Sequence, residues 1–334
     1  MVELREVGAD SLRVSRFLAA KDPLAILTQE LGDTFKTYRA KWEAAKTFKI
    51  TPKFPLHVDY ELQLECGLKC PMCPNGQKAV KSPLKLSLKT VSDLIKEGVS
   101  LGQMALGFGG LWEPLTAPNL PEIVALARDS GIIDAMLNTN GQLLTRAKSQ
   151  ELIKAGLTRL MVSVDAVTPE TYQKARPGGD YQLLENNILE FLAARQEAGV
   201  KLPILRLSFC VTKYNELELE PFLEKWANKV EFFSAQSYGR FSPKAPALFP
   251  QNSLFPAPGG RCAQPNKRLL IRHNGQVTPC CDLSGLELIM GDIKQESLLS
   301  VFNGEKIKSL RASLAGAKET WPRICQDCQD KYGS

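Results

Sequence analysis

The chain has 334 residues and a net charge of +6, and 44% of its residues are hydrophobic and 23% are charged. This composition is ordinary for a globular protein, and no apolar run is long enough to span a bilayer. The first residues lack the apolar core of a signal peptide, so we expect a cytoplasmic protein with no membrane partner. There the nine cysteines indicate metal or redox chemistry rather than disulfides.

The positive charge is concentrated in one segment. Between Phe232 and Cys281 the sequence contains six Lys or Arg residues and no Asp or Glu. Such a segment is either a solvated loop or the surroundings of an anionic cluster or substrate. It is short and its aromatic residues are not interleaved with the charges, so we expect no nucleic-acid partner.

Two stretches near the N-terminus have apolar residues at helical spacing. One lies around Leu12, Val14, Phe17 and Leu18, and the other spans residues 34–48. This period predicts an N-terminal helical extension over residues 1–50. No pair of strands is expected within it.

Strand-like runs alternate with helix-like runs from residue 51 to residue 240. Residues 56–65 alternate apolar and polar side chains, and we predict five further strands at 104–109, 133–139, 159–164, 204–212 and 229–235, with helices between them. Strands separated by helices predict an α/β fold with a mostly parallel, right-handed barrel.

The last third of the chain is predicted to form a separate small unit. Five prolines punctuate residues 241–260, which we interpret as a linker. Beyond it, in residues 261–334, Asn274-Gly275 predicts a hairpin turn between strands at 269–272 and 276–278. A helix is expected over 298–314. The total length allows a large domain and this smaller one.

Three cysteines after the first predicted strand are the most informative feature. Cys66, Cys70 and Cys73 have the spacing C-x3-C-x2-C and lie in a loop at the C-terminal end of that strand, where α/β barrels place their sites. Thiolates are the usual ligands of iron–sulfur clusters, although Cys-x-x-Cys pairs also hold zinc or serve as redox pairs. The motif resembles that of the radical S-adenosylmethionine (SAM) superfamily, whose fold is a partial (β/α)6 TIM-like barrel.

The resemblance implies a cofactor and a pocket for it. In this superfamily a [4Fe–4S] cluster leaves one iron open to SAM, and an electron cleaves SAM to methionine and a 5′-deoxyadenosyl radical. Gly109, Gly110 and Glu113 resemble the family motif that holds the methionine ammonium, although Leu111 and Trp112 interrupt it. The other positions that the resemblance assigns to SAM are Met72, Asn140, Ser163, Asp165 and Arg176. Asn140 is also compatible with an ordinary turn, and Arg176 with a solvent-facing side chain.

The fifth predicted strand places polar residues on one face. Arg206, Ser208, Cys210 and Thr212 alternate with apolar residues, and because the outer face of a barrel packs against helices, we expect the polar set to face inward. Cys210 is then either an inert buried thiol or a hydrogen-atom donor. Arg206, Arg240 or His57 could orient a substrate or assist loss of its proton.

The small C-terminal unit contains a second set of cysteines. Cys262, Cys280, Cys325 and Cys328 resemble the ligands of a SPASM or twitch auxiliary-cluster domain, with Cys281 as the rival of Cys280. The chain ends six residues after Cys328, so we expect one auxiliary [4Fe–4S] cluster with four cysteine ligands, and two clusters in all. Zinc is the alternative that spacing alone permits.

These resemblances imply a radical SAM oxidoreductase. The ligand pattern is similar to that of the radical SAM dehydrogenase of butirosin biosynthesis, so we expect oxidation of an alcohol in a small polar substrate such as a sugar or cyclitol. The alternatives are a radical epimerase that uses Cys210 and a peptide-modifying SPASM maturase. The expected partners are the small-molecule substrate and an electron donor such as flavodoxin or ferredoxin.

Overall fold

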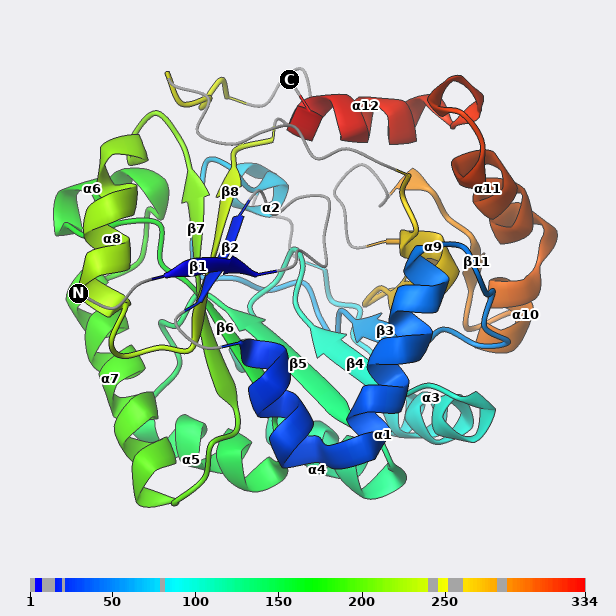
Figure 1. Cartoon of the computed structure of the whole chain (residues 1–334), viewed down its shortest axis with the longest axis horizontal. Coiled ribbons are helices and arrows are strands. Elements are labelled where there is room, and N and C mark those ends of the chain that lie inside the picture. Colours follow the sequence, from blue (N-terminus) through cyan, green and yellow to red (C-terminus); the bar gives the residue numbers. More distant parts are fainter. Residues whose placement is uncertain are drawn as a thin grey trace.

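The computed structural model describes residues 4–7, 16–19, 22–78, 82–239, 246–251, 261–280 and 287–333. Their strands form a single 11-stranded sheet in the order β1-β2-β8-β7-β6-β5-β4-β3-β9-β10-β11 (Figure 1). Most of the predicted linker at 241–260 lies outside the described residues. Within them, no helix is both long and apolar enough to cross a membrane.

Six parallel strands form the centre of the sheet, as the alternation of strands and helices predicts. Each pairs in parallel with its neighbour, and helices surround them on the outside (Figure 1). The strands are β3 (His57–Tyr60), β4 (Ala105–Phe108), β5 (Asp134–Thr139), β6 (Arg159–Ser163), β7 (Ile204–Val211) and β8 (Phe232–Ser237). The helices are α2 (Pro74–Lys78), α3 (Leu88–Leu101), α4 (Leu120–Ser130), α5 (Arg146–Ala155), α6 (Pro169–Ala175), α7 (Tyr181–Glu197) and α8 (Leu219–Trp226), with short 3₁₀ turns η1 (Pro114–Thr116) and η2 (Glu216–Glu218).

Local sequence signals explain where the helices begin and end. Ser87 and Thr145 accept backbone hydrogen bonds as N-caps of α3 and α5. Gly102, Gly131 and Gly156 end α3, α4 and α5 in the left-handed conformation, which glycine adopts without strain. A strand begins within three residues after each of these glycines.

The C-terminal unit extends the same sheet. β9 (Arg268–Ile271) pairs in parallel with β3, and β10 (Gln276–Thr278) and β11 (Gly291–Asp292) follow antiparallel. β9 and β10 form the hairpin predicted around Asn274-Gly275. The helix expected over 298–314 is divided at Gly304. The helical elements of this unit are α9 (Gln264–Lys267), α10 (Leu298–Asn303), α11 (Glu305–Ala315), η4 (Lys318–Thr320) and α12 (Arg323–Gly333).

The N-terminal prediction is partly wrong. Phe17 and Leu18 lie in strand β2 (Arg16–Ala19), which pairs antiparallel with β1 (Arg5–Val7) and with β8, while Leu12 and Val14 lie outside the described residues. β8 would otherwise be an open sheet edge, and covering that edge favours a strand over a helix. The second predicted helix is α1 (Pro23–Lys46), which is longer than expected and kinked at Gly32.

Helix α1 closes the N-terminal end of the barrel. Its buried Phe35, Tyr38 and Trp42 form a hydrophobic cluster with the starts of the strands. The cluster also contains Leu56, just before β3, and the strand residues Phe17, Ala19, Ala105, Ile204 and Phe232. The interior of the barrel therefore has a floor on this side, and its opposite end, where the strands finish, carries the loops.

Candidate active site

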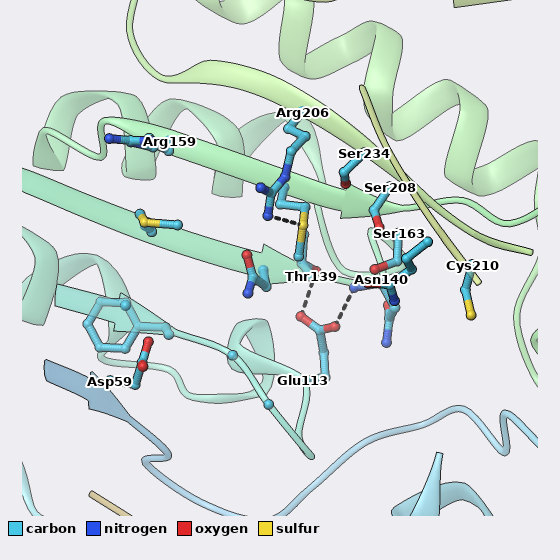
Figure 2. A pocket seen from close by; sticks show the side chains of 18 of the residues that line it. Asp59, Glu113, Thr139, Asn140, Arg159, Ser163, Arg206, Ser208, Cys210 and Ser234 are labelled. Atoms are coloured by element: carbon cyan, nitrogen blue, oxygen red, sulfur yellow. Dashed lines mark hydrogen bonds between the residues drawn. The ribbon is translucent and has the colours of Figure 1, made fainter. Parts of the chain in front are cut away.

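The interior of the barrel contains a cavity of about 630 Å³, a volume typical of small-molecule sites. It extends from α1 at the floor to the cysteine loop after β3. Side chains from neighbouring strands point into it (Figure 2). The sequence-predicted residues that line it are Cys66, Cys70, Met72, Cys73, Gly109, Gly110, Glu113, Asn140, Ser163, Asp165, Arg176, Arg206 and Cys210.

The cysteine loop is held by contacts with other loops at the same end of the barrel. The Cys73 backbone N–H donates to the Cys70 carbonyl at 3.1 Å, and the Lys69 N–H donates to the Pro177 carbonyl at 2.8 Å. The Asn75 side chain donates to the Leu111 carbonyl at 2.7 Å. These bonds join the loop to the segments after β4 and β6.

The donor set fits an iron–sulfur cluster with an open iron. Three thiols of one loop line the cavity, and two of them have N–H donors nearby: Asn140 Nδ2 is 3.7 Å from Cys66 Sγ, and Arg176 Nη1 is 3.9 Å from Cys70 Sγ. Hydrogen bonds to ligand sulfurs tune such clusters. Within the described ranges no three Cys, His, Asp or Glu side chains already converge on one metal position, so the fit rests on the chemistry of the thiols.

Glu113 connects the loops after β4 and β5. Its carboxylate accepts hydrogen bonds from the Thr139 hydroxyl at 2.6 Å, the Asn140 N–H at 2.7 Å and the Leu115 N–H at 3.0 Å (Figure 2). Burial raises the pKa of Glu113, and these donors oppose the rise. The inserted Trp112 folds back, with its indole N–H 2.9 Å from the Gly109 carbonyl. The carboxylate thus sets the relative position of two loops that line the cavity.

A buried network surrounds Asp165 at the end of β6. Arg176 Nε donates to Asp165 Oδ2 at 2.8 Å, and the Cys210 backbone N–H donates to Oδ1 at 2.6 Å. Asn215 donates to the carbonyls of Asp165 and Cys210. Asp165 has a φ of 61°, a left-handed conformation that Asp and Asn tolerate better than most residues. Arg176 is therefore buried in an ion pair rather than turned toward solvent.

The inward face of β7 largely follows the strand alternation. Arg206, Ser208 and Cys210 line the cavity, whereas the Thr212 hydroxyl lies beyond the strand and bonds to Asn215 at 3.0 Å. Burial, followed by the charge of Asp165, raises the pKa of Cys210 to about 12, so this thiol keeps its proton at neutral pH.

Arg206 is placed deep in the barrel. Its guanidinium lies over the rings of Phe17 and Phe232, 5.6 and 5.7 Å from their centroids, and contacts the Met161 sulfur. Arg240, the third predicted catalytic residue, lies outside the described residues.

The structure places His57, one of the candidates from the sequence, at the floor beside Asp59 and Arg268, which were not assigned from the sequence. His57 Nε2 lies 3.0 Å from Asp59 Oδ1, and Arg268 of β9 pairs with Asp59. Burial lowers the pKa of His57; the pKa of Asp59 is also lowered, because Arg268 and His57 outweigh the opposing effect of its burial. The sequence signal for this group is that His57 and Asp59 are two residues apart in the first predicted strand, so both side chains must lie on the same face of the sheet.

The C-terminal cysteines come from three different elements. Cys262 precedes α9, Cys280 follows β10, and Cys325 and Cys328 lie one turn apart on α12. Cys262 and Cys325 pack against the same hydrophobic cluster of Leu310, Leu314 and Trp321. Cys281, the rival ligand, lies outside the described residues.

Comparisons with known proteins agree with this arrangement. Residues 60–225 match the family model of the radical SAM superfamily, and residues 262–329 match that of the SPASM iron–sulfur cluster-binding domain. The GTP 3′,8-cyclase of Alkaliphilus oremlandii is 30% identical over 183 residues, which are 53% of this chain and 55% of that protein. The PqqA peptide cyclase of Gluconobacter oxydans is 29% identical over 203 residues, 60% of this chain and 54% of that protein. The chain thus spans about half the length of these curated relatives.

Solved structures share the fold. SuiB of Streptococcus suis bound to S-adenosylmethionine superposes with a TM-score of 0.63 at 16% identity, covering 91% of this chain and 79% of SuiB. BtrN in complex with AdoMet and 2-DOIA gives 0.53 at 16% identity, covering 82% of this chain and 93% of BtrN. At such identities the likeness concerns the fold. The two family models show that the chain carries a radical SAM domain, which implies SAM and a [4Fe–4S] cluster, and a C-terminal SPASM domain, which implies auxiliary iron–sulfur clusters.

Proposed function

We propose that this protein is a radical SAM dehydrogenase that oxidises an alcohol carbon of a small polar molecule to a carbonyl. The observation that carries the proposal is the cavity itself: its volume is about 630 Å³, α1 closes its floor, and polar side chains of β6, β7 and β8 line part of its wall. A cavity that is closed at one end accommodates a small molecule more readily than a peptide that must pass through it. A four-cysteine domain that continues the barrel sheet through β9 lies beside it.

The residues proposed to hold the cofactors all line the cavity. Cys66, Cys70 and Cys73 would bind the first cluster, and Met72, Gly109, Gly110, Asn140 and Ser163 line the space beside it. When bound, SAM and its reduced cluster supply the radical that takes a hydrogen atom, and the auxiliary cluster supplies an electron acceptor. Glu113 and Arg176 already have protein partners, so their main contribution is to position the loops around SAM.

The oxidation removes two electrons from the substrate. A hydrogen atom leaves the carbon, a proton leaves its hydroxyl and one electron leaves as the carbonyl forms. The electron acceptor would be held by Cys262, Cys280, Cys325 and Cys328. Glu61, which follows β3, contacts His273 of the β9–β10 turn, and both side chains are buried, so this contact fixes the acceptor domain against the barrel. A flavodoxin or ferredoxin would supply the reducing electron.

Cys210 supports a second candidate function, redox-neutral epimerisation. Its thiol lines the cavity, and its neighbour across the sheet is Gln236 of β8. A thiol on the cavity wall can return a hydrogen atom to the opposite face of the substrate carbon. This reaction needs no external acceptor, so it leaves the second set of cysteines without a role in turnover.

The two functions differ in the origin of hydrogen in the product. The anaerobically reconstituted enzyme is incubated with SAM, a reductant and a panel of alcohols in deuterated water, and the products are analysed by mass spectrometry and NMR. We expect a carbonyl product without deuterium at the reacting carbon, and Cys210→Ala should retain most activity. Deuterium at a carbon of inverted configuration, together with an inactive Cys210→Ala variant, would contradict the dehydrogenase assignment. Cys210→Ser is the control for side-chain volume.

A further inference from the structure

Three serines form one row across the barrel wall. Ser163 of β6 pairs in register with Ser208 of β7, and Ser208 pairs with Ser234 of β8. All three line the cavity (Figure 2). Neighbouring strands are about 5 Å apart, so one small ligand can contact two neighbouring serines of the row with different hydroxyl groups.

These hydroxyls are available to a ligand. Ser208 is 8% exposed and Ser234 is 2% exposed, and within the described residues no side-chain hydrogen bond joins any of the three hydroxyls to a protein group. The parallel ladder already pairs the backbone of these strands, so the serines are not needed to satisfy it. The three hydroxyls face the cavity, and a ligand hydroxyl can both donate to a serine and accept from it.

The charges around the cavity limit what the ligand can carry. Among the residues that the structure describes, five arginines and four carboxylates line it, and each of these carboxylates accepts at least one hydrogen bond from the protein. Asp22 caps α1, while Asp59, Glu113 and Asp165 have the partners described above. An ammonium group on the ligand would therefore compete with protein donors for these described carboxylates, and it would meet the positive charge of Arg206, two residues before Ser208 on the same strand.

We propose that Ser208 and Ser234 form the specificity wall for a polyol substrate without an amino group, such as a neutral sugar or cyclitol. Ser163 lies at the border between this wall and the predicted SAM pocket. The proposal names the substrate class for the dehydrogenase proposed above and rests on that function. Hydroxyls next to the reacting carbon would bond to Ser208 and Ser234, and the reacting carbon would lie toward the cysteine loop, where the strands end.

Binding, measured separately from turnover, tests the wall. Isothermal titration calorimetry under anaerobic conditions, on the reconstituted enzyme with SAM, uses myo-inositol, glucose, glucosamine and N-acetyl-glycyl-glycine amide as probes. We expect saturable binding of a neutral polyol and weaker binding of glucosamine than of glucose. Ser208→Ala and Ser234→Ala should each weaken polyol binding about tenfold, the loss expected for one hydrogen bond to a buried group.

Matched variants separate recognition from folding. Ser208→Thr and Ser234→Thr keep the hydroxyl and should retain most of the affinity. Ser149→Ala removes a serine hydroxyl that is fully buried without a partner, in α5 and away from the cavity, and should leave binding unchanged. Cluster absorbance reports whether each variant is intact.

The proposal is overturned if no neutral polyol binds saturably, if glucosamine binds more tightly than glucose, or if the Ser208→Ala/Ser234→Ala double variant binds like the unmodified enzyme. Binding of the peptide probe alone would also overturn it and would favour peptide modification. A polyol that binds through the serines but is not oxidised would refute the dehydrogenase function and leave the wall in place.

Discussion

Replacing Asp165 by Asn should destabilise the protein strongly. The Asp165 side chain is 1% exposed and its partner Arg176 is 13% exposed, so Asn would leave a guanidinium buried without its counter-ion. Removing one member of a buried pair costs about 3–5 kcal/mol. Asn keeps the volume of the side chain and tolerates the φ of 61°, so the loss would come from the charge and from weaker bonds to Arg176 and the Cys210 N–H.

Urea denaturation followed by far-UV circular dichroism measures this loss in the full chain. The Asp165→Asn/Arg176→Met double variant also removes the unpaired charge of Arg176 and should recover part of the stability. Asp93→Asn is the surface control: its pair with Lys89 has side chains that are 59% and 85% exposed, and the change should cost less than about 1 kcal/mol. A loss below about 1 kcal/mol for Asp165→Asn would refute the reasoning that this pair organises the site.

Three further outcomes follow from the structure. Gly107→Ala should destabilise the barrel by about 1–3 kcal/mol, because the added Cβ would lie 2.4 Å from Asp59 Oδ1 and 2.9 Å from His57 Nε2; an unchanged urea midpoint would contradict this. Gly76→Ala should reduce iron retention, because its Cβ would lie 2.4 Å from the Cys70 carbonyl oxygen, and iron analysis at the level of the unmodified protein would count against it. Reconstituted protein should hold about eight irons, and changing the three cysteines of the C-x3-C-x2-C motif to Ala should leave about half; full retention would refute two separate clusters.

The predictions that succeed rest on constraints within one segment. Strand alternation is one: Leu205, Leu207 and Phe209 are fully buried under the helices, which leaves Arg206 and Ser208 to face the cavity. The Asn274-Gly275 turn is another, because Gly275 adopts a φ of 93° that glycine provides without strain. Such features depend on residues a few positions apart, so their physical cause is present in the local sequence.

The failures concern partners that are distant in the sequence. Helical spacing around Phe17 and Leu18 was a weak local preference, and pairing with the edge of β8 overrode it. The local sequence is compatible with a solvent-facing Arg176, whereas the structure pairs its guanidinium with Asp165. The buried network of His57 and Asp59 includes Arg268, which pairs with Asp59 and is more than two hundred residues away in the chain.

The sequence by itself therefore determined the cysteine spacing, the order of strands and helices and the inward face of β7, because these depend on local periodicity and on the ligand chemistry of the side chains. The tertiary structure decided which groups share one cavity, which charges are paired and that α1 closes the floor. Those outcomes depend on burial and on hydrogen bonds between segments far apart in the chain, for which local sequence carries no signal.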